Sequence, residues 1–100
     1  MSHGGGFTGV QLDKTCFAND LKQLPPDVMD AFREKIKLLL NNPGAGSLKL
    51  HALGGYYPTV YSINITVGKG KAYKATFNKE GSIAIFLRAG THKQIDKNPR

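Results

Sequence analysis

Hydrophobic and polar residues follow two different periods along this chain of 100 residues. Between residues 15 and 40, apolar side chains recur every three or four positions, which is the spacing of one face of a helix. Between residues 60 and 89 they occupy every second position, which is typical of strands with one buried face. A short segment at 7–12, where Val10 and Leu12 lie on one side, predicts a further strand before the helices.

Prolines and asparagines set the limits of the predicted helices. Pro25 ends the first helix, and Pro26 can begin the second because the first helical residue needs no N–H group. The run Asn41-Asn42-Pro43-Gly44 ends the second helix near Leu40. Because the link is so short, the helices must fold back on each other as a hairpin that needs a sheet against its apolar side. The core-facing stripe of the second helix is expected to contain Val28 or Met29, Phe32, Ile36, Leu39 and Leu40.

The strand pattern completes the predicted fold. Alternating segments at 60–67, 71–78 and 82–89 are separated by turns at 68–70 and 78–81, which gives an antiparallel meander. We therefore predict an α+β fold in which an N-terminal helical hairpin packs on one face of a small, mainly antiparallel twisted sheet, with the element order β-α-α-β-β-β. Residues 7–100 are expected to form a single domain, and residues 1–6 a disordered segment or an expression remnant.

The lengths of the two turns set the register of the strands. A three-residue loop at 68–70 places Asn64 opposite Lys74. A second such loop at 79–81, with Gly81 in the left-handed conformation, places Lys74 opposite Phe86 and one diagonal step from Arg88. The core-facing residues of the last strand are then Ile83, Ile85 and Leu87. The residues expected on the face that no helix covers are Asn64, Lys74, Thr76, Phe86 and Arg88.

The positive charge of the chain is concentrated in its second half. The formal net charge is +7, and residues 1–50 contain six basic and five acidic residues against eight and two in residues 51–100. A basic surface attracts nucleic-acid phosphates, acidic protein segments or anionic membranes, although a solvated basic surface without a partner gives the same count. The longest apolar run, 83–87, is too short to span a bilayer, so we expect no membrane segment and a cytoplasmic protein.

Four residues of the second half are candidates for chemistry. Lys74 and Arg88 can hold a phosphate on the open face, with Phe86 between them as a surface on which a base stacks; the alternative is a pair of solvated charges. His92 lies four residues after Arg88, and His51 precedes the meander; imidazole exchanges protons near neutral pH, but each can also be an ordinary polar loop residue. A single cysteine and scattered histidines suggest neither a disulfide nor a metal site.

Two short motifs and the order of the elements resemble one known family. Leu48-Lys49-Leu50-His51-Ala52-Leu53-Gly54-Gly55 leads into the meander, and Leu87-Arg88-Ala89-Gly90-Thr91-His92 ends it. With the short strand and the helical hairpin, they resemble the RelE/ParE superfamily of bacterial toxins over residues 7–97. The resemblance is to the RelE-type branch, which carries a His-x-Leu-x-Gly segment and an Arg-x-Gly-Thr/Ser-His ending.

The resemblance implies the toxin of a type II toxin-antitoxin system, a metal-independent endoribonuclease that cleaves mRNA, commonly at the ribosome, and is silenced by a cognate antitoxin protein. By position, His92 matches the terminal catalytic histidine, Arg88 the arginine before it, His51 the histidine before the sheet and Lys74 a basic strand residue. His92, with or without His51, would activate the 2′-hydroxyl and protonate the leaving oxygen, while Lys74 and Arg88 stabilise charge on the phosphate. No cofactor is expected. The residues expected to bind RNA are Lys49, Asn64, Lys71, Phe86 and Lys93.

Two positions depart from the pattern of that branch. Asp96 stands four residues after His92, where these toxins often have an aromatic residue, and the strand segment at 62–65 has no titratable residue. Two alternatives therefore stay open: a non-nuclease ParE-like inhibitor of DNA gyrase, and a catalytically weakened module of the same fold that binds RNA or protein.

Overall fold

The structure, a computed structural model, describes residues 7–12, 16–56, 59–66, 72–97 and 99. Its five strands form one sheet in the order β1-β5-β4-β3-β2, in which β1 is parallel to β5 and the other pairs are antiparallel. The predicted α+β class and the order of the predicted elements are confirmed, and β2, η1 and α3 are additional. In chain order the elements are β1 (Gly9–Leu12), α1 (Cys16–Gln23), α2 (Pro26–Asn41), the 3₁₀ turn η1 (Gly46–Leu48), β2 (His51–Leu53), β3 (Val60–Thr66), β4 (Tyr73–Glu80), β5 (Ile83–Thr91) and α3 (His92–Lys97).

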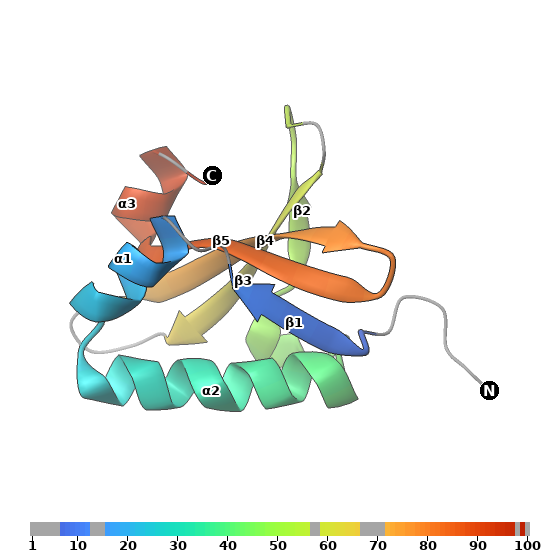
Figure 1. Cartoon of the computed structure of the whole chain (residues 1–100), viewed down its shortest axis with the longest axis horizontal. Coiled ribbons are helices and arrows are strands. Elements are labelled where there is room, and N and C mark those ends of the chain that lie inside the picture. The colour runs from blue at the N-terminus through green and yellow to red at the C-terminus, as the bar shows by residue number, and fades with distance from the viewer. Residues whose placement is uncertain (1–6, 13–15, 57–58, 67–71, 98, 100) are drawn as a thin grey trace.

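The helices lie in different places around the sheet. Figure 1 shows α2 running along one face of the sheet, below it in this view, while α1 and α3 lie at the same end of the sheet. The α1 helix contacts β5, and α3 contacts β4 and β5. The face turned away from α2 is therefore partly covered by an element that the sequence pattern does not predict.

The boundary between the two predicted helices and the end of the second lie close to the predicted residues. Pro25 has an extended backbone (φ −59°, ψ 152°), and α2 begins at Pro26. The helix ends at Asn41, and the next N–H group, that of Asn42, donates to the carbonyl of Leu38. The predicted stripe is confirmed for Val28, Phe32 and Leu39, which are buried, whereas Met29, Ile36 and Leu40 are only partly buried.

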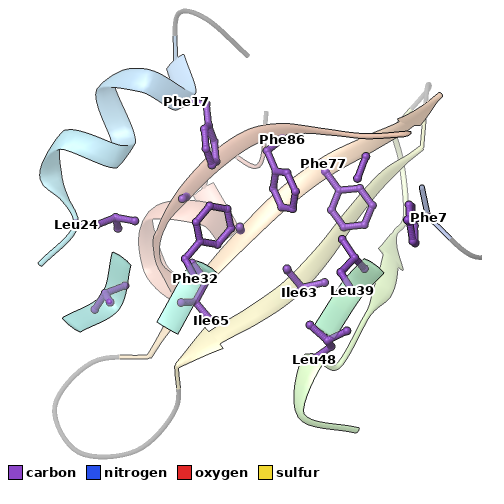
Figure 2. Close-up of a cluster of buried hydrophobic side chains, with 14 residues drawn as sticks. Phe7, Phe17, Leu24, Phe32, Leu39, Leu48, Ile63, Ile65, Phe77 and Phe86 are labelled. Carbon is purple, nitrogen blue, oxygen red and sulfur yellow. The ribbon is translucent and has the colours of Figure 1, made fainter. Parts of the chain in front are cut away.

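An aromatic cluster forms the centre of the core (Figure 2). The ring of Phe86 lies 5.2 Å from that of Phe77, 5.3 Å from that of Phe32 and 5.7 Å from that of Phe17, measured between centroids. All four side chains are buried, and these separations are typical of favourable aromatic contacts. The prediction that Phe86 stacks on RNA from the open face is therefore wrong, because its ring joins α1 and α2 to the sheet.

The two hairpins differ in how far their predicted register holds. In the first, Asn64 lies opposite Lys74, as predicted, before an irregularity that places Thr66 opposite Tyr73. In the second, Gly81 has the predicted left-handed backbone (φ +60°), but Glu80 pairs with Ile83 across a turn of two residues rather than three. The first half of β5 is thereby shifted by three residues along β4 relative to the predicted register. Because side chains alternate between the two faces of a sheet, an odd shift moves each side chain to the face opposite the predicted one.

This shift explains which β5 side chains enter the core. Ala84 and Phe86 are buried, whereas Ile83, Ile85 and Leu87, which were predicted to face the helices, are partly exposed.

A β-bulge in β5 then restores the predicted face of Arg88. Phe77 lies opposite Phe86, but the preceding residue Thr76 lies opposite Arg88, so Leu87 is the extra residue. The second half of β5 is consequently shifted by four residues from the predicted register, and an even shift leaves each side chain on its predicted face. Arg88 thus lies on the face opposite α2, as expected, although its neighbour on β4 is Thr76.

Candidate functional site

A row of four residues crosses the sheet on the face turned away from α2. His51 of β2 pairs with Ser62 of β3, Ser62 with Thr76 of β4, and Thr76 with Arg88 of β5. Because adjacent strands lie about 4.8 Å apart, the backbones of His51 and Arg88 are separated by about 14 Å. The row beside it contains Asn64, Lys74 and Gly90.

The guanidinium group of Arg88 is held by a carboxylate from α1. Its Nε donates to Oδ2 of Asp20 at 2.7 Å, its Nη2 donates to Oδ1 at 3.1 Å, and the N–H of Ala89 donates to Oδ2 at 3.0 Å. The strand β1 pairs with β5 only as far as Phe86, so α1 can reach the edge of β5 beyond it. The side chains are 28% exposed for Arg88 and 11% for Asp20. An anion that approaches Arg88 therefore meets a neighbouring carboxylate.

Lys74 also forms an ion pair with a carboxylate, in this case one from the C-terminal helix α3. Its Nζ lies 2.8 Å from Oδ1 of Asp96 on α3, and its side chain is only 11% exposed, against 67% for Asp96. The hydrogen bond from Lys74, together with the charges of Lys74 and His92, holds the pKa of Asp96 below its usual value, although desolvation acts in the opposite direction. Asp96 thus pairs with the ammonium group to which an RNA phosphate would bind. It is the residue that departs from the pattern of the RelE-type branch, where an aromatic residue is frequent at this position.

His92 begins α3 and is fixed there by its neighbours. Its N–H donates to the carbonyl of Ala72 at 3.0 Å. The helix start is a capping box in which the N–H of Gln94 donates to Oγ1 of Thr91 at 3.3 Å and the N–H of Thr91 donates to Oε1 of Gln94 at 2.9 Å. The Nε2 atom of His92 is buried and has no hydrogen-bond partner among the described residues. A buried polar atom without a partner is costly, so this ring is a candidate for a ligand contact.

His51 has a defined ring orientation although it is exposed. Its Nδ1 lies 2.7 Å from the carbonyl oxygen of Lys49, so in the neutral ring Nδ1 carries the proton and donates. The lone pair of Nε2 is then available to accept a proton. Lys49 has a left-handed backbone (φ 49°), which turns its carbonyl toward the histidine two residues later.

The middle of the row is covered by the C-terminal segment. Oγ1 of Thr76 donates to the carbonyl of Pro99 at 2.6 Å. Ser62 is also buried, and its Oγ has no hydrogen-bond partner among the described residues. The expectation of a face without a covering helix is therefore wrong, because α3 and Pro99 pack over its centre.

Comparison with known proteins identifies the fold. No protein-family model matches the chain, and a search of curated proteins finds no match. Among solved structures, YafQ from E. coli strain BL21(DE3) matches with a TM-score of 0.67 and 18% identity over 86% of this chain and 94% of that one. A chain of the E. coli DinJ-YafQ toxin-antitoxin complex gives 0.66 and 18% over 86% and 93%. A chain of the RelB-RelE antitoxin-toxin complex from Methanococcus jannaschii gives 0.59 and 28% over 87% and 95%.

The chain has the fold of the RelE-type toxins. The predicted resemblance is therefore confirmed at the level of the fold. In this RelE-like protein, the candidate catalytic residues occupy three places around the polar face. Lys74 and His92 both adjoin Asp96, whereas His51 lies at the far end of the row and Arg88 is drawn toward α1.

The residues predicted to bind RNA differ in their exposure to solvent. Lys49 and Lys93 are exposed and can reach a polyanion. Asn64 is buried on the predicted face, and Phe86 is in the core. Lys71 lies outside the described residues.

Two features that shape the site, Asp20 and the capping box at the start of α3, are not among the sequence predictions. Asp20 is 68 positions from Arg88, and no local pattern predicts that they meet. The capping box at the start of α3 did leave a signal, because Thr91 followed by Gln94 is the spacing that such a box requires. Recognising it would have predicted the helix and placed His92 in its first turn.

Two further properties of the described residues bear on the class of protein. No group of three or more His, Cys, Asp or Glu among them could hold a metal ion. None of the helices in the described ranges is long and apolar enough to cross a membrane.

Proposed function

We propose that this RelE-like protein is the toxin of a toxin-antitoxin pair and inhibits translation by cutting mRNA at the ribosome without a metal ion. The observation that carries the proposal is that Lys74, Arg88, His51 and His92 all lie on or beside one polar face of a basic chain. Lysine and arginine bind phosphate, and imidazole exchanges protons near neutral pH. The RelE-type fold supports the same conclusion.

The proposed cleavage needs one base, one acid and compensation of charge. The 2′-oxygen of RNA loses its proton and attacks the adjacent phosphorus, the bond from phosphorus to the 5′-oxygen breaks, and that oxygen takes up a proton. The products are a 2′,3′-cyclic phosphate and a 5′-hydroxyl. The available Nε2 of His51 suits the base, and His92 suits the acid. Lys74 and Arg88 stabilise the charge that develops on the phosphate oxygens.

Binding of RNA must rearrange the covered face. The phosphate has to replace Asp96 at Lys74 and to approach Arg88 beside Asp20, and the buried Nε2 of His92 has to become accessible. The proposed reaction therefore includes movement of α3 or of Pro99 away from the centre of the row.

A cognate antitoxin is the proposed protein partner. Two of the similar structures are toxin-antitoxin complexes, DinJ-YafQ and RelB-RelE. An acidic segment of the antitoxin would cover the exposed lysines around the polar face and exclude RNA. We place this pair in the cytoplasm, where mRNA is translated.

Induced expression in bacteria tests the nuclease directly. We would map the ends of a translated mRNA by primer extension in cells that express the parent, His92→Ala or Arg88→Ala. New cuts in the parent that vanish in both variants are expected. Arg33→Ala is the matched control, because Arg33 lies on the exposed face of α2 and pairs only with the exposed Asp30 among the described residues. Circular dichroism would establish that each variant is folded.

The other outcomes distinguish the alternatives. Cuts that persist in His92→Ala would refute its catalytic role. Growth arrest with intact mRNA and loss of supercoiling would identify a gyrase inhibitor.

A catalytically weakened binding module is the second candidate, and the two ion pairs favour it. Lys74 and Arg88 both carry a carboxylate partner, which lowers their affinity for phosphate. If this candidate is correct, the parent produces no cuts but still binds RNA or an antitoxin in a pull-down experiment.

A further inference from the structure

A polar pocket of about 470 Å³ lies between the end of α1, the edge of β5 and α3. Figure 1 shows both helices at this end of the sheet. The volume is within the usual range for sites that bind small molecules. Its wall includes Arg88, so the pocket adjoins the candidate catalytic face. We propose that this pocket binds one nucleotide of the RNA, next to the phosphate at Arg88, an inference that rests on the proposed function.

The described residues of the pocket carry two cations and one carboxylate, which leaves an excess of positive charge at Lys97. Arg88 and Lys97 provide positive charge from two different elements. Asp20 is the one carboxylate among the described residues of the lining, and both of its oxygens already accept hydrogen bonds from Arg88 or the N–H of Ala89. Lys97 is exposed in the last turn of α3 and makes no ion pair with a described residue. A phosphate between the two cations would therefore gain hydrogen bonds from charged donors.

Gln94 offers the pocket an amide of fixed orientation. Its Oε1 accepts from the N–H of Thr91, so the NH₂ end of the same amide points the other way. No described residue accepts a hydrogen bond from that NH₂ group. Gly90 makes this arrangement possible, because a Cβ atom there would lie 2.7 Å from Oε1 of Gln94. The two N–H donors suit a base carbonyl or ring nitrogen.

Apolar side chains complete a surface for a base or a ribose. Leu24, which directly follows α1, and Ile95 of α3 line the pocket, and both are buried. Gln23 lines it from the exposed end of α1 and adds a second side-chain amide. The cations can bind the phosphate of a nucleotide, the apolar side chains can contact its ribose, and the two amides can bind its base. A site for a simple anion needs only the cations.

NMR titration of the ¹⁵N-labelled chain with the four nucleoside monophosphates tests the inference. We expect saturable shifts at the amides of Gly90 and Thr91 and at the side-chain amide of Gln94, with one base preferred. Inorganic phosphate is titrated in parallel. Equal shifts at these amides with phosphate alone would show an anion site without base recognition, and no shift with any nucleotide would overturn the inference.

Three variants connect the shifts to the pocket. Lys97→Ala is expected to raise the Kd of the preferred nucleotide about fivefold, the size expected for one exposed charge pair. Lys22→Ala is the matched control, since Lys22 is an exposed lysine of α1 outside the pocket lining. Gln94→Glu keeps the acceptor of the capping box but loses the NH₂ donors, so it should weaken binding while α3 stays folded. Unchanged affinity in both Lys97→Ala and Gln94→Glu would overturn the inference.

The NMR titration and the mapping of mRNA ends together separate this inference from the nuclease. If nucleotides bind in the pocket but mRNA stays intact in expressing cells, the inference of a nucleotide pocket stands and the proposal of nuclease activity is wrong. Cuts that disappear in His92→Ala, in a protein whose pocket amides never respond to nucleotides, would retain the nuclease and refute the pocket.

Discussion

The two faces of the sheet are stabilised by different interactions. On the face against α2, four phenylalanine rings make contacts at centroid separations of 5.2 to 5.7 Å. On the opposite face, the side chains of Ser62, Asn64 and Thr76 are buried, and two ion pairs hold cations of the sheet. Apolar burial is favourable in any arrangement that excludes water, but buried polar groups are favourable only when each has a partner.

The comparison indicates which face the chain maintains for binding. The buried Oγ of Ser62 and Nε2 of His92 have no partner among the described residues, and both belong to the polar side. Unsatisfied groups of this kind lower stability and are commonest where a protein binds or reacts. We therefore expect the aromatic face to contribute more to the free energy of unfolding than the polar face does. The experiments below compare the two contributions.

The largest effect is expected from Phe86→Ala. Removal of a fully buried ring that contacts three others should lower the free energy of unfolding by about 3–5 kcal/mol. Urea unfolding followed by circular dichroism measures the change. Leu12→Ala is the control, because Leu12 is an exposed apolar residue on β1. A cost for Phe86→Ala no larger than that of the control would mean that Phe86 is not in the core.

A double-mutant cycle on Asp20 and Arg88 should give the next largest effect. Asp20→Asn and Arg88→Gln each leave a partly buried charge with a weaker partner, so we expect a coupling energy of about 2 kcal/mol, the size of hydrogen bonds to charged groups. The exposed pair of Arg33 and Asp30 on α2 provides the comparison and should couple by less than about 1 kcal/mol. Equal coupling in the two pairs would refute a structural role for Asp20.

Thr76→Val tests how firmly the C-terminal segment covers the polar face. Loss of the hydrogen bond to Pro99 should cost about 1 kcal/mol and raise hydrogen exchange in α3. Thr8→Val removes the hydrogen bond of an exposed hydroxyl to Ser82 and should have less effect. If both variants leave exchange in α3 unchanged, the contact with Thr76 does not hold the cover in place.

The smallest effect is expected from pH. Because the pKa of Asp96 is lowered in the folded protein, the pair with Lys74 contributes its full stability above the usual value of 3.8 and loses it as the pH falls below that value toward the lowered pKa. The contribution should stay below about 1 kcal/mol, because Asp96 is largely exposed. Urea unfolding should show Asp96→Asn as less stable than the parent near neutral pH and equal to it at the acid end. Asp30→Asn is the control, and a pH-independent difference for Asp96→Asn would contradict the prediction.

Local patterns predicted most of the fold. The prolines between α1 and α2, the alternation in β3 and β4, and the pairing of Asn64 with Lys74 follow from neighbouring residues. The second hairpin was mispredicted because a turn of two residues and one of three both accommodate Gly81 in the left-handed conformation. The resulting error of three residues in the register placed Phe86 on the solvent side in the prediction, although its ring lies in the core.

The sequence predicted which basic residues lie in the candidate site, but it did not predict the carboxylates that form ion pairs with them. Arg88 was placed on the right face only because the bulge at Leu87 added a fourth residue to a shift of three. The partners of the two cations, Asp20 and Asp96, depend on tertiary packing, since α1 reaches the edge of β5 and α3 folds over β4. Neither ion pair has a sequence signature.

The parallel pair of β1 and β5 has a consequence for how the chain folds during synthesis. Gly9 pairs with Ile83, so β1 has no partner strand until β5, more than 70 residues later, has been made. Contacts between residues so far apart form slowly, because the entropy of closing a long loop precedes any gain from the contact. Asp20 and Arg88 depend on the same late closure. The polar face therefore cannot form until the residues of β5 have been synthesised and have left the ribosome.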